Sequence, residues 1–215
     1  MDRRSRLSRS SCGAAGLGLV LLTLAAAPDA AAQNVQPPQI VPRAAWGARS
    51  ADTALMKPHA PRAIVIHHTA EPQQPRQTLA QKLQRLQRFS RTEGSVEKRP
   101  KPAWGDVPYH YYIDARGRIA EGRHVGYEGD TNTPYDTAGR IQIVLEGQFD
   151  NERPGAAQLR SLDRLVVWLA VRHRVPAAAI SGHKDHVPSS ECPGRNLTSY
   201  LPRLRDKVAK ASFSR

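Results

Sequence analysis

The sequence predicts a single α/β domain in which a central mixed β-sheet is flanked by helices. Two short runs rich in β-branched residues, 62–68 (RAIVIHH) and 141–147 (IQIVLEG), have the composition of buried strands. Two longer segments, 75–89 and 156–174, place leucines at the spacing of one helix face. No internal repeat or second domain is evident, so these strands and helices are expected to form one layered unit.

The first half of the predicted domain contains strands and one amphipathic helix. Residues 62–68 end in two histidines and are expected to form a buried strand. Residues 75–89 carry apolar side chains on one face and Gln and Arg on the other, which predicts a surface helix. Residues 91–106 are charged and interrupted by glycine and proline, which predicts a loop. Residues 109–114 and 118–122 flank a short Ala-Arg-Gly segment, the pattern of a β-hairpin.

The second half contains two further strands and two helices. Residues 141–147 are expected to form a strand, and 156–174 a helix that ends before Pro176. Residues 180–182 predict a short strand that leads into a loop rich in Gly, Pro, Ser and His. Residues 197–212 predict a final helix.

Residues 1–32 have the layout of a secretory signal peptide. Four arginines precede an apolar run at 13–27, and three alanines at 30–32 offer a cleavage site. We therefore expect export to the periplasm, the cell wall or the extracellular space, with no stable membrane span after the signal is removed. An uncleaved N-terminal anchor is the alternative. An extended leader, 33–42, precedes the folded domain, 43–212.

Charge and cysteine content limit the classes of function. The chain carries a formal net charge of +13, which favours anionic partners such as an acidic cell-wall polymer. Export and the lack of a nucleic-acid-binding motif argue against a nucleic-acid partner. Cys12 leaves with the signal peptide, so Cys192 stands alone in the mature chain and an internal disulfide is excluded. This thiol is reactive, metal-bound, intermolecular or merely tolerated.

A zinc site is one interpretation of the histidines and the single cysteine. His67 closes one predicted strand, His183 follows another, and Cys192 lies in the loop after His183. Zinc suits imidazole and thiolate ligands together, and three protein ligands leave a fourth position for water. The other interpretation is that the histidines are structural and the cysteine is a small buried side chain. Spacing alone leaves both open.

Five segments, taken in order, resemble the zinc-dependent N-acetylmuramoyl-L-alanine amidases of the peptidoglycan recognition protein type, also called type-2 amidases. The matching segments span most of the mature chain, roughly 40–204. They are RAAWGAR (43–49), IVIHHTA (64–70), DVPYHYYIDARGRIAEGR (106–123), IQIVLEGQFD (141–150) and GHKDHVPSSECPG (182–194). Ordered agreement of several segments is more specific than any single motif.

The resemblance implies an amidase domain at 43–212 whose groove holds a peptidoglycan stem peptide above a Zn²⁺ ion. It implies that His67, His183 and Cys192 are the zinc ligands. It places the active-site tyrosine of the family on Tyr109, whose hydroxyl would stabilise the developing oxyanion or orient the water. Ser190, two residues before the ligand cysteine, would add a weaker hydrogen bond. Without the resemblance, Tyr109 reads as an aromatic that packs in a strand.

Side-chain alternation separates neighbouring residues. His68 should point away from His67, and His110 away from Tyr109, because successive side chains of a strand face opposite sides. Both are expected to have structural or supporting roles.

The sequence departs from the family in three places. The His183–Cys192 spacing is one residue longer than expected, and His186 inside that loop is a rival ligand. Some relatives use a glutamate at the position of Val144; Glu146, on the same side, is a candidate general base or else an ordinary strand-end carboxylate. Residues 126–139 also differ, which puts substrate preference in doubt.

Two residues at the start of the divergent segment are candidates for substrate binding. His124 and Tyr127 are expected to line the groove.

Three functions follow from these patterns. The leading hypothesis is an exported zinc amidase that cleaves the bond between the muramoyl lactyl group and L-alanine. The main rival is a non-catalytic peptidoglycan-binding module, but in such relatives the cysteine is typically replaced. A secreted polyanion-binding protein with a structural zinc is the third. Cys192 together with Tyr109 favours the enzyme.

Overall fold

A six-stranded mixed sheet forms the centre of the fold in the computed structural model, which describes residues 35–96 and 98–213. The strand order is β1-β6-β5-β7-β2-β8, and only β5 and β6 are antiparallel. The strands are β1 (Ile40–Val41), β2 (Ala63–His68), β5 (Tyr111–Ile113), β6 (Ile119–Glu121), β7 (Arg140–Leu145) and β8 (Ile180–Gly182). The predicted signal peptide and Cys12 lie outside the described residues.

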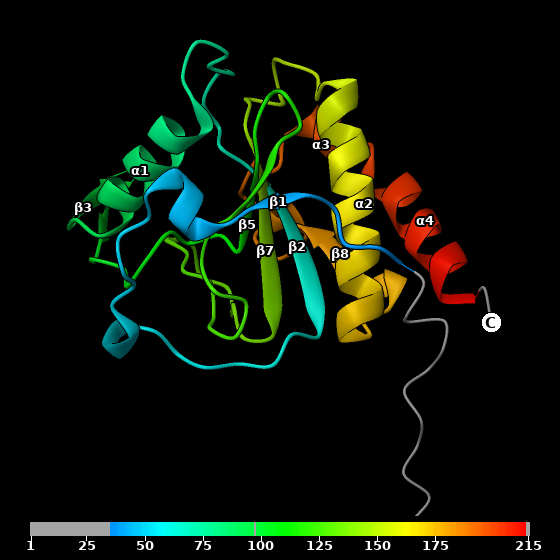
Figure 1. Ribbon diagram of the computed structural model, residues 1–215, viewed down its shortest axis with the longest axis horizontal. Coiled ribbons are helices and arrows are strands. Elements are labelled where there is room, and N and C mark those ends of the chain that lie inside the picture. The colour runs from blue at the N-terminus through cyan, green and yellow to red at the C-terminus, as the bar shows by residue number, and fades with distance from the viewer. Residues whose placement is uncertain (1–34, 97, 214–215) are drawn as a thin grey trace, which may run out of the picture.

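Helices cover both faces of this sheet, which confirms the predicted fold class (Figure 1). Helix α1 lies on one side, and α2 and α4 lie on the other. The helices are α1 (Leu79–Ser90), α2 (Ala156–His173), α3 (Arg195–Thr198) and α4 (Leu201–Phe213). Short 3-10 turns are η2 (Arg43–Trp46), η3 (Thr53–Leu55), η4 (Ala177–Ala179) and η5 (His183–Asp185). Within the described part of the chain, no helix has the length and apolar character to cross a membrane.

The two faces of the sheet have cores of different size. Toward α2 and α4, the alternate residues Ile64, Ile66, Ile141 and Ile143 are fully buried in a large apolar cluster. Toward α1, a smaller cluster includes Trp46, Leu83, Tyr112 and Val144. Since side chains alternate along a strand, the α1 side of β2 and β7 also receives the polar residues His67, Gln142 and Glu146. Polar side chains on this face are therefore the ones available to build a site.

Several predicted boundaries need correction. The helix predicted at 75–89 begins at Leu79, because the Thr78 hydroxyl accepts from the Gln81 N–H and the Gln81 side chain accepts from Thr78 N–H. The loop predicted at 91–106 instead contains a small antiparallel hairpin, β3 (Gly94–Val96) with β4 (Arg99–Lys101).

The two ends of the domain also differ from the prediction. The single helix predicted at 197–212 is divided into α3 and α4. The extended leader contributes Ile40 and Val41 as β1, which pairs parallel with β6, so the sheet begins before residue 43.

Candidate metal centre

Two neighbouring parallel strands bring His67 and His183 together. β2 pairs with β8 so that Ile66 lies opposite Gly182, and each histidine is the next residue along its chain. Ligand sites in sheets of this kind commonly form at the carboxyl ends of parallel strands. The two imidazole ring centroids lie 4.9 Å apart.

The loop after His183 returns Cys192 to the same place. The Cys192 carbonyl accepts from Lys184 N–H at 2.7 Å, and the Cys192 N–H donates to Ser190 Oγ at 3.2 Å. The Cys192 Sγ then lies 3.5 Å from His67 Nδ1 and accepts from the His68 N–H at 3.5 Å. Ser190, predicted as a catalytic hydroxyl, thus contacts the backbone of the cysteine.

The three predicted ligands form a compact group. One ligand atom from each of His67, His183 and Cys192 lies within 4.8 Å of the others. Tetrahedral zinc with bonds of about 2.0–2.1 Å to nitrogen and about 2.3 Å to sulfur separates those two atoms by about 3.6 Å. The observed 3.5 Å between Nδ1 and Sγ matches that separation. The donor set and its spacing therefore fit a zinc ion.

The outer nitrogens of both histidines have polar partners. His67 Nε2 donates to Gln142 Oε1 at 2.5 Å, and His183 Nε2 lies 2.7 Å from Thr133 Oγ1. This arrangement leaves Nδ1 as the nitrogen of each ring for a metal. Metal-ligating histidines in proteins usually have such a partner on the second ring nitrogen.

Burial sets the protonation of two of these groups. Burial, with the adjacent His183, lowers the pKa of His67 to about 3, so the imidazole is neutral and able to ligate at neutral pH. Burial raises the pKa of the Cys192 thiol to about 12. A bound divalent cation displaces this proton, because the thiolate is the ligand form.

Tyr109 lies beside this group. Its ring centroid is 5.2 Å from that of His67. Burial, reinforced by Cys192, raises the pKa of Tyr109, so its hydroxyl remains a hydrogen-bond donor. The neighbouring His110 faces the other way, as expected: its Nδ1 accepts from Gln142 N–H and its Nε2 donates to the Tyr127 carbonyl, both at 2.8 Å.

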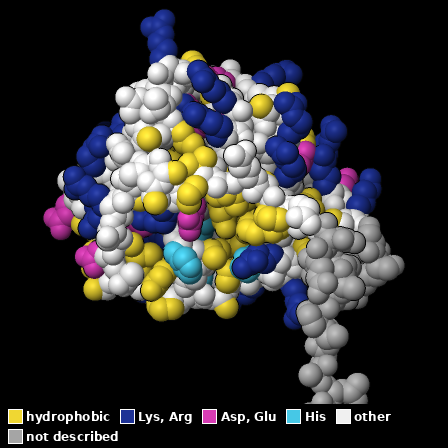
Figure 2. Space-filling view, viewed as in Figure 1, with side chains coloured by type: hydrophobic (Ala, Val, Ile, Leu, Met, Phe, Trp, Pro, Cys, Tyr) yellow, Lys and Arg dark blue, Asp and Glu magenta, His cyan; other side chains and the backbone are white. Residues whose placement is uncertain are grey.

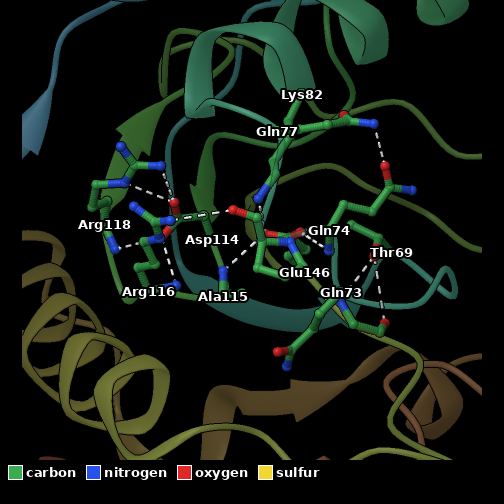
Figure 3. Close-up of polar contacts among 12 residues, drawn as sticks. Thr69, Gln73, Gln74, Gln77, Lys82, Asp114, Ala115, Arg116, Arg118 and Glu146 are labelled. Carbon is green, nitrogen blue, oxygen red and sulfur yellow. Dashed lines mark hydrogen bonds and ion pairs between the residues drawn. The ribbon is translucent and has the colours of Figure 1, made fainter.

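Glu146 lies in a buried polar network between three segments (Figure 3). Its carboxylate accepts from Lys82 Nζ at 2.8 Å, from Gln74 N–H at 2.7 Å and from Ala115 N–H at 2.8 Å. These contacts tie α1, the segment after β2 and the β5–β6 turn to the end of β7. They favour the interpretation of Glu146 as a strand-end carboxylate over that of a general base.

The remaining candidates lie around the ligand group. His186 Nε2 is 2.8 Å from Ser181 Oγ, and its ring stacks on Tyr135 with centroids 5.4 Å apart. The exposed His124 and the half-buried Tyr127 contact each other edge to face, 6.1 Å between centroids. Their predicted role in substrate binding stays a prediction.

Sequence reasoning missed three residues that contact the ligand histidines or their partners: Gln142, Thr133 and Tyr135. Gln142 gave one signal, since it is a polar residue within the apolar run IQIVL. Thr133 and Tyr135 gave none, because the segment that holds them has no strand or helix periodicity.

Comparison with known proteins places the chain among similar sequences and folds. The sequence model of the family described as N-acetylmuramoyl-L-alanine amidase matches residues 57–195, more than half of the chain. Peptidoglycan-recognition protein SD of Drosophila melanogaster is 28% identical over 188 residues, covering 86% of this chain and 93% of that protein.

Two further matches carry the word amidase in their names. The human N-acetylmuramoyl-L-alanine amidase is 28% identical over 173 residues, covering 76% of this chain but 28% of the human protein. The solved structure of the endolysin N-acetylmuramoyl-L-alanine amidase LysCS from Clostridium intestinale superposes with a TM-score of 0.58 at 25% identity, covering 79% of this chain and 97% of that one.

Proposed function

The chain belongs to the N-acetylmuramoyl-L-alanine amidase family, and on that premise we propose that it is an exported zinc enzyme that hydrolyses the amide bond between the muramoyl lactyl group and L-alanine of peptidoglycan. One observation carries the proposal: His67, His183 and Cys192 form a zinc-compatible group with the protonated Tyr109 beside it. Three protein ligands leave one position of a tetrahedral ion for the reactants, as in catalytic zinc sites.

In this proposal the protein residues hold and polarise the reacting amide. Zinc, when bound, supplies a Lewis acid for the scissile carbonyl and lowers the pKa of a water molecule. Tyr109 donates a hydrogen bond to the oxygen on which negative charge develops, and its burial makes that bond stronger than it would be in water. Ser190 keeps the Cys192 backbone in place through the bond from the Cys192 N–H.

The substrate and its location follow from the relatives and from charge. The names of matched relatives refer to peptidoglycan recognition and to the muramoyl-alanine bond, and we propose the same polymer as substrate here. Lys and Arg side chains are spread over the face drawn in Figure 2, which suits a protein that approaches an anionic wall. His124 and Tyr127 are proposed to contact the glycan-linked stem peptide, and the predicted signal peptide is proposed to direct export.

A non-catalytic peptidoglycan-binding module is the second candidate, because members of one fold can differ in activity. The two are separated by incubating residues 33–215 with purified sacculi and analysing soluble products by mass spectrometry. The amidase releases stem peptides with a free L-alanine amino terminus, a chelator stops the release, and added Zn²⁺ restores it. Zinc binding and sacculus binding with no released peptide would establish the binding module instead.

A further inference from the structure

The segment between β6 and β7 contacts the metal group from outside. Its Thr133 hydroxyl lies 2.7 Å from His183 Nε2, and its Tyr135 hydroxyl donates at 3.0 Å to Gln142 Oε1. Gln142 Oε1 in turn accepts from His67 Nε2. We propose that Thr133, Tyr135 and Gln142 are positioning residues that hold both imidazole rings with Nδ1 toward zinc and thereby couple zinc binding to the order of residues 126–139. The inference rests on the zinc site of the proposed function, but not on the reaction.

Gln142 fixes the tautomer of His67. The residue is 1% exposed, and its side-chain Oε1 accepts two hydrogen bonds, from His67 Nε2 and from the Tyr135 hydroxyl. An amide oxygen only accepts, so the His67 proton resides on Nε2 and the lone pair of Nδ1 faces Cys192. The Gln142 backbone is itself held on both sides by His110, through Gln142 N–H to Nδ1 and His110 N–H to the Gln142 carbonyl.

The amide nitrogen of the same residue shows what this orientation costs. Among the described residues, Gln142 Nε2 is buried and has no hydrogen-bond partner. A buried amide donor left unpaired costs about 1–3 kcal/mol, so the side chain is retained at a cost. The two hydrogen bonds that Gln142 Oε1 accepts, one of them from the proposed ligand His67, offset the cost of the unpaired nitrogen.

Thr133 performs the same task for His183. When His183 ligates through Nδ1, its Nε2 carries the proton and donates to Thr133 Oγ1. The Thr133 hydroxyl hydrogen then points to Thr131 Oγ1, 2.6 Å away, and the Thr133 N–H donates to the same oxygen at 3.1 Å. A hydroxyl that donates onward is a better acceptor, so this short chain strengthens the bond from His183.

Tyr135 links the two halves. Besides its bond to Gln142, its ring lies 5.0 Å from the His183 ring and stacks at 13° on His186. His186 is held in turn by Ser181 Oγ. His186 therefore packs against Tyr135 and supports it, a role that accounts for its position without making it a ligand.

Coupling follows because both ligand histidines are linked by hydrogen bonds to residues 126–139. His183 bonds directly to Thr133, and His67 bonds to Gln142, which accepts from Tyr135. Zinc that fixes the rings of His67 and His183 favours the arrangement in which Thr133 and Tyr135 are bonded. By linkage, an ordered segment must favour zinc by the same free energy.

The test is zinc affinity, measured by competition with a chromophoric chelator and requiring no peptidoglycan. Thr133→Val and Gln142→Leu remove the acceptors and are expected to weaken zinc binding about 10–100-fold, the usual cost of losing such partners. Thr133→Ser keeps the hydroxyl and should bind zinc like the parent protein. Thr92→Val makes the same Thr-to-Val change after α1, outside this network, and should also bind like the parent.

Two further measurements separate positioning from folding. Substitution of Co²⁺ reports ligand geometry by its visible spectrum, and Thr133→Val should change that spectrum while the Thr133→Ser spectrum stays the same. Amide hydrogen exchange of residues 126–139 should slow on adding zinc to the parent, and less so in Tyr135→Phe, which keeps the ring. Unchanged zinc affinity in folded Thr133→Val and Gln142→Leu, or zinc-independent exchange in the parent, overturns the proposal. If zinc affinity and hydrogen exchange respond as expected but the protein releases no stem peptide, only the amidase assignment is overturned.

Discussion

The Lys82 ammonium and the Glu146 carboxylate lie 2.8 Å apart, and both side chains are almost fully buried, at 5% and 4% exposed. Removing one partner of a buried ion pair typically lowers the free energy of unfolding by about 3–5 kcal/mol, because the other charge stays buried and uncompensated. Glu146 also accepts hydrogen bonds from the Gln74 and Ala115 N–H groups, so the pair connects α1 to the segment after β2 and to the β5–β6 turn. Variants of this pair can therefore distinguish the two roles considered for Glu146, a structural carboxylate and a general base.

If the pair is structural, Lys82→Met and Glu146→Gln each lower the free energy of unfolding by about 3 kcal/mol, and the double variant loses less than their sum. The folded double variant should keep amidase activity within about tenfold of the parent, since general-base catalysis contributes about 10²–10⁴-fold. Urea titrations and peptide release at a temperature where all variants are folded measure both quantities. A folded Glu146→Gln protein without activity would establish the general base instead.

Cys192→Ser should abolish both zinc binding and peptide release. Serine is a far poorer zinc ligand than the thiolate, and Cys192 Sγ lies within bonding geometry of an ion held by His67. His186→Ala is the matched comparison: it should retain full zinc occupancy, because its Nε2 is bonded to Ser181 instead. The zinc content of both purified variants, measured by mass spectrometry, decides which residue is the ligand. Zinc retained in Cys192→Ser and lost in His186→Ala would make His186 the ligand.

Secondary structure was predictable where one period dominates. β2, β7, α2 and β8 were expected within a few residues, since β-branched runs and leucine stripes each fit one geometry. The three ligands could be proposed from the sequence, because His67 and His183 stand at strand ends and Cys192 lies in the loop after His183, and the resemblance then favoured zinc over a structural role. The bonds from Gln142, Thr133 and Tyr135 depend on the register of β2 against β7 and on an aperiodic segment, which no local pattern records.

Tyr109→Phe should lower kcat for peptide release by about 10²–10³-fold while zinc affinity stays unchanged. The substitution keeps the ring that packs beside His67 and removes only the hydroxyl, the group proposed to bind the developing oxyanion. Since this interaction strengthens in the transition state, kcat should fall more than KM rises. Steady-state kinetics on a defined muropeptide gives both constants. A kcat within twofold of the parent would leave Tyr109 as a packing residue.

His110 should make the metal-free protein less stable in mild acid. Burial lowers the pKa of His110 to about 3, against 6.5 in an unfolded chain, and both of its nitrogens are already bonded. Between pH 6.5 and pH 3, His110 is protonated in the unfolded chain but neutral in the folded protein. The contribution of neutral His110 to folding stability is therefore fully present above pH 6.5 and is lost as pH falls toward 3. Lowering the pH from 7.5 to 5.5 should therefore cost about 1 kcal/mol through this residue alone. His110→Gln has no such proton to bind, so the difference in unfolding free energy between it and the parent, from urea titrations of both zinc-free proteins, should shrink by that amount at pH 5.5. The same difference at both pH values would mean that the folded protein protonates His110 as readily as the unfolded chain does.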